Sequence, residues 1–185
     1  MIKHLFKIAF FVISMGLIGV SCTEEIDLDQ VNDLEINPVL ESSLFYFEAA
    51  AGDFFLGGSG AYTAGDYVVL DIFDNEFVND NLIKAELVFE TVNSINRAYQ
   101  VQVDFLDNTN TLRHSFTFSA DASPNNENLT FEHIEVFEDE TLENLKETTT
   151  LVFRLTMLPG APVDPNSPGS IHLKSKGVFY LNIDR

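Results

Sequence analysis

The sequence predicts an all-β fold: an immunoglobulin-like antiparallel β-sandwich of about eight strands with one short helix. From residue 42 onward, apolar side chains recur mostly at every second position, which is the spacing of strands with one buried face. Clusters of Asn, Asp, Gly and Pro between these segments favour turns. Sequential strands with one buried face imply two packed sheets, and a jelly roll or a small barrel is the alternative arrangement.

The first 21 residues predict a secretory signal peptide and not a part of this fold. A short basic start precedes an apolar run from Ile8 to Val20. A helix needs about 20 apolar residues to span a bilayer, and this run is shorter. Gly19 and Ser21 supply small residues at the positions that precede a cleavage site.

Cys22 is the single cysteine of the chain and stands directly after this segment, so no internal disulfide can form. The stretch from Leu17 to Cys22 resembles the end of bacterial lipoprotein signals, in which an obligatory cysteine becomes the acylated first residue. Gly19 departs from the pattern, because most such signals carry Leu there. The resemblance implies cleavage before Cys22, lipidation of Cys22, and a membrane as partner through the lipid anchor.

The residues after the cysteine are acidic. Thr23 to Asp27 resembles the acidic segment of surface-exported lipoproteins of the Bacteroidota type, which implies an address in the cell envelope, at the outer membrane. Residues 22–40 are therefore predicted to be a lipidated cysteine and an acidic tether, and residues 41–185 to be the sandwich domain. Like charges favour an extended tether.

The charge of the chain excludes one class of partner. Removal of residues 1–21 takes two of the ten basic residues and none of the 29 acidic ones, which leaves a net charge of −21. Such a chain repels nucleic acid and anionic headgroups. It is nevertheless rich in Phe, Leu, Val and Ile, and this apolar content is ample for a packed core.

The first three predicted strands show the pattern with increasing clarity. Leu44–Phe47 and Tyr67–Phe73 are short, nearly continuous apolar runs. Lys84–Val92 alternates, with Leu87 and Phe89 on one face. These segments are predicted to form strands of the core.

A hairpin is predicted next. Arg97–Leu106 and Leu112–Ala120 both alternate, and the apolar face of the second includes Phe116. Residues 107–110 read Asp-Asn-Thr-Asn, which favours a tight turn. The two strands should therefore pair with each other.

The C-terminal part adds three strands and the helix. Leu129–Phe137, Leu151–Leu158 and Ile171–Ile183 are predicted strands, the last with Gly177 near its middle, where a bulge or bend is expected. Glu138–Thr148 is predicted to be helical, because acidic residues crowd its start and its leucines are three residues apart.

Two connections have unusual compositions. The segment Ala49–Asp66 combines glycines with the apolar run Phe54–Leu56, which we expect to pack as a further strand and not to line a contact surface. Prolines recur at every third position from 159 to 168, a spacing that places them on one face of a polyproline II helix. We interpret this segment as a stiff crossover between the sheets.

No catalytic or zinc signature is present in the sequence. His114, His133 and His172 fall on three different predicted strands, so we expect core or edge histidines that bind neighbouring polar groups. Ser59 lies in a glycine-rich stretch, but Ala61 stands where a nucleophile elbow requires its second glycine. We expect a flexible loop there.

An acidic segment is the densest group of candidate calcium ligands. Asp74, Glu76, Asn79 and Asp80 supply hard oxygen ligands. The segment lacks the glycine and the terminal glutamate of an EF-hand loop, so a solvated turn is expected. We assign neither a metal site nor a cofactor.

These observations predict a non-catalytic binding or assembly module of the cell envelope, with an envelope protein or a glycan as partner and no enzyme activity. The alternative is a glycan-binding surface lipoprotein. Glycan sites usually use Trp platforms, which the chain lacks, and five tyrosines are the substitutes: Tyr46, Tyr62, Tyr67, Tyr99 and Tyr180. A carboxylate-dependent hydrolase is the more remote alternative.

Overall fold

Alternating buried and exposed side chains build eight strands in the part of the chain that the computed structural model describes, residues 37–55 and 63–183. The predicted signal peptide, Cys22 and most of the predicted tether lie outside these residues. The strands are β1 (Val39–Ala50), β2 (Thr63–Val69), β3 (Leu82–Asn93), β4 (Tyr99–Leu106), β5 (Leu112–Ala120), β6 (Leu129–Phe137), β7 (Thr150–Met157) and β8 (Ser170–Leu181).

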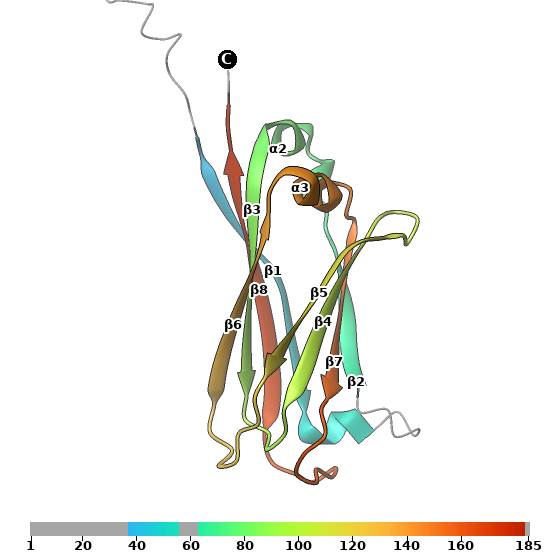
Figure 1. The fold of residues 1–185 in the computed structure, drawn as a ribbon, viewed down its shortest axis with the longest axis vertical. Coiled ribbons are helices and arrows are strands. Elements are labelled where there is room, and N and C mark those ends of the chain that lie inside the picture. The colour runs from blue at the N-terminus through green and yellow to red at the C-terminus, as the bar shows by residue number, and fades with distance from the viewer. Residues whose placement is uncertain (1–36, 56–62, 184–185) are drawn as a thin grey trace, which may run out of the picture. The chain divides into compact units, whose positions relative to one another are not determined.

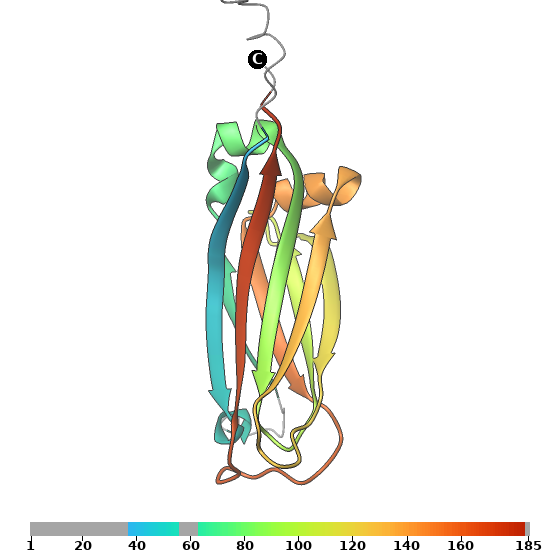
Figure 2. The same cartoon turned by 90° about the vertical axis from the view of Figure 1, so that its left-hand side faces the viewer.

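Two four-stranded antiparallel sheets pack against each other, in the orders β1-β8-β3-β6 and β2-β7-β4-β5. Figure 1 shows the two layers, and Figure 2 turns the first sheet towards the viewer. Four pairings are nested: β1 pairs with β8, β2 with β7, β3 with β6 and β4 with β5. This is the pairing of one long antiparallel hairpin rolled into two sheets, which is the jelly-roll arrangement.

The predicted sandwich of about eight strands with a short helix is therefore confirmed. The strand order also decides among the three arrangements that the sequence left open: the immunoglobulin-like sandwich that was expected first, the jelly roll and the small barrel. In an immunoglobulin-like sandwich the first two strands are neighbours in one sheet, whereas β1 and β2 belong to different sheets here. The arrangement is thus the jelly roll. The residue pattern did not show this, because alternation assigns side chains to faces and does not name the neighbouring strand.

The interior between the sheets is filled by the apolar faces that the alternation predicts. Leu87 and Phe89 of β3 and Val103 and Phe105 of β4 are fully buried. Phe116 is only half-buried, because β5 is an edge strand, but its ring lies 5.2 Å from that of Phe89. The other fully buried large side chains include Tyr99, Phe137, Leu145, Leu151, Leu155, Ile171, Leu173 and Phe179.

The predicted helix is confirmed as α3 (Asp139–Lys146). Leu142 and Leu145, three residues apart, are both buried, so this short helix gains its stability from packing. At its start the backbone N–H of Glu138 donates to the hydroxyl of Thr141 at 2.9 Å, which satisfies a group that the helix leaves unpaired.

A second helix, α2 (Glu76–Asn81), stands where the sequence predicted a solvated turn. Asn75 precedes it, and the side-chain oxygen of Asn75 accepts a hydrogen bond from the backbone N–H of Val78 at 3.3 Å. At six residues the helix is too short for apolar periodicity to reveal it, and only the N-cap residue signals it. Among the described residues, none of the helices is long and apolar enough to span a membrane.

The predicted strand Tyr67–Phe73 is displaced by four residues. β2 ends at Val69, and a 3₁₀ turn, η4 (Ile72–Asp74), follows. Phe73 in this turn is buried, and its ring lies 6.0 Å from that of Phe179. A short continuous apolar run does not distinguish a strand from a buried turn, which explains the error.

The irregularity expected at Gly177 lies instead in β1, the strand opposite. Gly177 keeps its register with both neighbouring strands, whereas the pairing of β1 with β8 shifts between Ser43 and Phe45, which leaves Leu44 as an extra residue. Gly177 has a different role. A Cβ atom there would lie 2.5 Å from the ring of Phe179, so the glycine makes room for that ring.

The loop after β1 packs, as expected, but not as a strand. A 3₁₀ helix, η3 (Ala51–Phe55), carries Phe54 into the core, where its ring lies 4.9 Å from that of Tyr99. A 3₁₀ helix of five residues suffices to bury this side chain. Residues 56–62 lie outside the described part of the chain.

The proline-containing connection from β7 to β8 crosses from one sheet to the other, as the interpretation as a crossover requires. Its path is fixed from the side: the guanidinium of Arg97 donates hydrogen bonds to the carbonyl oxygens of Leu158 and Ala161. A turn closes its second half, where the backbone N–H of Ser167 donates to the carbonyl of Asp164 at 3.0 Å. A continuous polyproline helix is therefore interrupted.

The turn between β4 and β5 is organised by one carboxylate. Asp107 accepts hydrogen bonds from the hydroxyl and backbone N–H of Thr109, from the backbone N–H of Thr111 and from the guanidinium of Arg113, at 2.7–2.9 Å. Asn110 completes the turn with a φ of 62°, a conformation that Asn adopts more readily than most residues. These donors, the Thr109 hydroxyl first, hold the pKa of Asp107 far below its ordinary value.

The core assignment predicts a clear contrast in stability within β4. Phe105→Ala removes a fully buried ring and should lower the free energy of unfolding by about 3–5 kcal/mol. Gln100→Ala, on the exposed face of the same strand, should change it by about 0.5 kcal/mol or less. Urea unfolding of both variants measures the difference, and equal losses would contradict the assigned faces.

The turn carboxylate predicts a loss of stability in acid. Because the folded chain lowers the pKa of Asp107, its contribution is complete above the unfolded pKa near 4 and falls as the pH drops towards the folded value. Asp107→Asn should therefore destabilise the domain at pH 7 and much less at pH 2.5. Urea unfolding at both pH values tests this, with Asp164→Asn as a control from another turn. A difference independent of pH would refute it.

Candidate functional site

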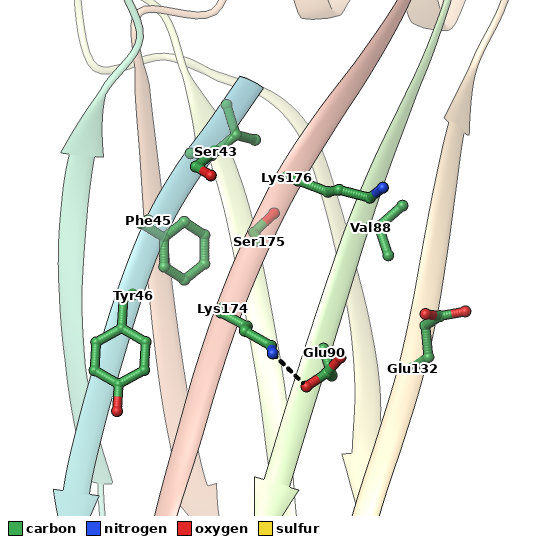
Figure 3. Close-up of a pocket in the computed structure, with 10 residues that line it drawn as sticks. Ser43, Phe45, Tyr46, Val88, Glu90, Glu132, Lys174, Ser175 and Lys176 are labelled. Atoms are coloured by element: carbon green, nitrogen blue, oxygen red, sulfur yellow. Dashed lines mark ion pairs between the residues drawn. The ribbon is translucent and has the colours of Figure 1, made fainter. Parts of the chain in front are cut away.

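The outer face of the β1-β8-β3-β6 sheet is hollowed by an open depression, which we call the trough (Figure 3). Its larger part has a volume of about 760 Å³. A smaller part of about 250 Å³ adjoins it, since Tyr46, Glu90 and Lys174 line both. The larger part is also lined by Ser43, Leu44, Phe45, Val88, Glu132, Ser175 and Lys176, and the smaller part by Val92, Asn128 and His172.

A single row of residues across four strands forms the middle of the trough. Tyr46 of β1 lies opposite Lys174 of β8, Lys174 lies opposite Glu90 of β3, and Glu90 lies opposite Glu132 of β6. Directly opposite residues of antiparallel strands point to the same face of the sheet. The four side chains therefore share the outer face, as Figure 3 shows.

The extra residue in β1 determines which aromatic ring faces outward. Without the shift at Leu44, Phe45 would stand opposite Lys174 and point out of the sandwich. With the shift, Phe45 points inward and stacks on Phe153 of β7, with ring centroids 4.4 Å apart. Tyr46 then takes the outward position and exposes 62% of its surface.

Although exposed, the side chain of Tyr46 is held by hydrogen bonds. Its hydroxyl lies 3.0 Å from Oε2 of Glu48 and 2.7 Å from Nδ1 of His172. Nε2 of His172 lies 2.8 Å from the hydroxyl of Ser170. One consistent assignment has Ser170 donating to Nε2, Nδ1–H donating to the Tyr46 oxygen, and the phenol donating to Glu48.

The hydrogen bond to Glu48 raises the pKa of Tyr46 above its ordinary value, and burial and the charge of Glu48 act in the same direction. The phenol therefore stays protonated at physiological pH. Holding an exposed side chain in one orientation costs conformational entropy that burial does not return. A ring that is fixed in advance loses less entropy when a ligand packs on it, which favours binding.

Each lysine of the trough is paired with a carboxylate. Nζ of Lys174 lies 2.7 Å from a carboxylate oxygen of Glu90, and Nζ of Lys176 lies 3.1 Å from one of Glu41. Such partly exposed pairs contribute little to stability. Their effect is on the local charge, because each pair neutralises one carboxylate in a domain that is strongly acidic.

Two histidines that the sequence placed on separate strands are brought together elsewhere. His114 of β5 and His133 of β6 share the carboxylate of Glu135, at 2.7 and 3.0 Å. The ring of His133 stacks on that of Phe118 at 5.0 Å. This cluster joins the edge strands of the two sheets, whereas His172 lies in the trough.

The acidic segment with the candidate calcium ligands forms local structure through its asparagine side chains. Asn75 caps α2, and the side-chain nitrogen of Asn79 donates to the carbonyl of Phe73 at 3.3 Å. Within the described ranges, no group of three or more His, Cys, Asp or Glu side chains is arranged to hold a metal ion. Ser59, like Cys22, lies outside those ranges.

The tyrosines considered as glycan platforms are dispersed. Tyr99 is buried in the core, and Tyr180 is half-buried with its hydroxyl 3.2 Å from Glu86. Tyr67 exposes 65% of its surface on the other sheet. Tyr62 lies outside the described residues. Of the tyrosines that the structure describes, Tyr46 is the one that lines the trough.

Sequence reasoning named Tyr46 but missed the rest of the trough. One signal for it exists: His172, Lys174 and Lys176 alternate along a predicted strand of a chain that has few basic residues. Alternation places the three on one face. The partner of Lys174 is Glu90, which is 84 positions away in the sequence, and alternation alone does not identify such a pair.

The chain matches no protein-family model and none of the curated proteins compared with it. Solved structures with a similar fold include the infectious bursal disease virus VP2 subviral particle, at 9% identity and a TM-score of 0.42 over 78% of this chain and 36% of that one. They also include Desmodium yellow mottle tymovirus, at 15% identity and a TM-score of 0.29 over 80% of this chain and 90% of that one.

A third similar structure is a Bacillus endospore appendage, described as a disulfide-linked pilus, at 10% identity and a TM-score of 0.33 over 81% of this chain and 93% of that one. The chain spans about a third of the length of the VP2 chain. At these identities and TM-scores, the similarities carry no argument about function.

Proposed function

We propose that this chain is a lipid-anchored protein of the cell envelope, at the outer membrane, whose jelly-roll domain is a non-catalytic binding or assembly module. The anchor part of the proposal is supported by the signal peptide pattern and by Cys22. One observation carries the binding part: Tyr46 is an exposed ring fixed by hydrogen bonds in the middle of an open trough.

In this proposal the acidic segment after Cys22 is a tether that gives the domain its reach. Residues 23–38 contain six acidic residues and no basic one. A flexible chain of this length spans roughly 20–24 Å between its ends, and like charges extend it further. Such a tether holds a ligand-binding face clear of the lipid headgroups, which also repel the acidic domain.

The trough argues for binding and against hydrolysis. Glu90 and Glu132 are its carboxylates, and a hydrolase with two carboxylates needs one of them as a general acid, usually in an apolar pocket. Glu90 is engaged by Lys174 at 2.7 Å, and Glu132 is exposed. Neither has the surroundings of a general acid.

A second surface favours an assembly role. On the outer face of the other sheet, Val69, Thr150, Leu106 and Leu112 form a row across all four strands. Val69 and Leu112 expose 64% and 56% of their surfaces, and Tyr67 stands beside Val69 on the same face. Exposed apolar side chains gathered on one face are typical of protein contact sites.

The anchor is tested by Cys22→Ser. We expect mass spectrometry of the mature protein to show acyl chains on Cys22, and the variant to be released from membranes because the proposal makes these acyl chains the attachment. Cys22→Ala should behave in the same way. Retention of either variant on membranes through an uncleaved N-terminal segment would contradict the proposal.

The binding role is tested by recovery of partners from gently solubilised membranes. Tyr46→Ala should lose a ligand that the trough holds, whereas Tyr67→Ala, Val69→Ser should lose a protein that the apolar face holds. Both changes affect exposed side chains, so the melting temperature should stay within a few degrees of the parent. Recovery that neither variant changes would refute both surfaces as binding sites.

A further inference from the structure

We propose that the trough binds a neutral oligosaccharide, with one sugar ring stacked on Tyr46. The inference rests on the proposed binding function and adds the class of ligand to it. Three features of the trough point to this class: an apolar platform, paired donors and acceptors, and carboxylates that disfavour an anion.

The platform is the ring of Tyr46. One face of a sugar ring presents C–H groups, which pack on an aromatic ring, while the hydroxyl groups around its rim need polar partners. Tyr46 offers this surface because 62% of the residue's surface is exposed and its hydroxyl is fixed by Glu48 and His172. The ring therefore keeps its orientation before the sugar arrives, which lowers the entropy cost of stacking.

The polar partners stand beside the platform. In the row that contains Tyr46, Lys174 supplies only donors and Glu90 only acceptors, and the two lie 2.7 Å apart. A sugar hydroxyl both donates and accepts, so two neighbouring hydroxyls match such a pair. Asn128, whose amide does both, lines the smaller part of the trough.

The charge of the trough selects a neutral ligand. Lys174 pairs with Glu90 and Lys176 with Glu41, so both lysines already have a carboxylate partner, and Glu132 adds a further carboxylate to the lining. An anionic ligand would meet these carboxylates and the negative potential of the whole domain. A cation is attracted to the acidic surface in general and gains nothing specific here. A neutral polyhydroxylated ligand is not repelled by the carboxylates, and it can use the paired donors and acceptors.

The extent of the trough favours a chain of sugars over a single one. Its lining runs along β8 from His172 to Lys176, and four steps along a strand span about 13 Å. The trough is open, so a polymer has room to continue beyond this length. The proposed ligand is therefore a segment of a polysaccharide.

The test uses the full mature lipoprotein in a polyoxyethylene detergent, because sugar-based detergents would compete for the site. Biosensor binding is measured against immobilised neutral polysaccharides, namely xyloglucan, galactomannan, laminarin and amylopectin, and against anionic polygalacturonate. We expect saturable binding to at least one neutral polymer and none to polygalacturonate.

Two matched variants locate the site. Tyr46→Ala should weaken binding by at least tenfold, whereas Phe77→Ala, which removes an exposed aromatic ring from α2 outside both proposed surfaces, should leave it unchanged. Tyr46→Phe keeps the ring but loses its bonds to Glu48 and His172, so binding should weaken less than in Tyr46→Ala. Circular dichroism of each variant verifies that it is folded.

Absence of binding to all four neutral polymers, or binding to polygalacturonate alone, would overturn the inference. So would equal losses in Tyr46→Ala and Phe77→Ala. These failures differ from a failure of the proposed function: if the lipoprotein still recovers an envelope protein in a Tyr46-dependent manner, the trough is a binding site and only the ligand class is wrong.

Discussion

Phe45 of β1 stacks on Phe153 of β7 across the interior, and Phe47 packs on the same ring from its edge, with centroids 4.4 and 5.3 Å away. These contacts hold an edge strand of one sheet against an inner strand of the other. They also explain the extra residue at Leu44, because only the shifted register sends both phenylalanines inward. The outward position of Tyr46, and with it the trough, depends on this aromatic contact. The site is thus a consequence of how the core is packed.

At the opposite margin of the sandwich, the two sheets are joined by polar as well as aromatic side chains. There β5 and β6 are the edge strands, and His133 stacks on both Phe116 and Phe118 while Glu135 joins it to His114. Unprotected edges invite pairing with other chains. Side chains that bridge the two sheets at this margin tie the edge strands to each other. Half-buried polar groups are stable in this place because each has a partner.

Much of the fold could be predicted from sequence, since alternation is a local property. β5 and β6 begin and end at the predicted residues, and β4 differs only at its start. The pattern failed where a side chain is buried without alternation, as Phe73 is, or where an element is as short as α2. The trough could not be predicted, because the pairing of Lys174 with Glu90 depends on strand order. Its central ring, Tyr46, faces outward only because of a bulge whose cause is the distant Phe153.

The nested strand order has a consequence for how the chain reaches its folded form. β8 follows the other described strands in the sequence, yet it lies between β1 and β3 in the sheet. Neither β1 nor β3 can therefore complete its pairing before β8 is present. Ala50 pairs with Ser170 and Val39 with Tyr180, and contacts between such distant residues form slowly. A chain with this topology keeps its first sheet incomplete until β8 is present. The strand order therefore places the decisive folding step late, because seven of the eight described strands precede β8 in the sequence.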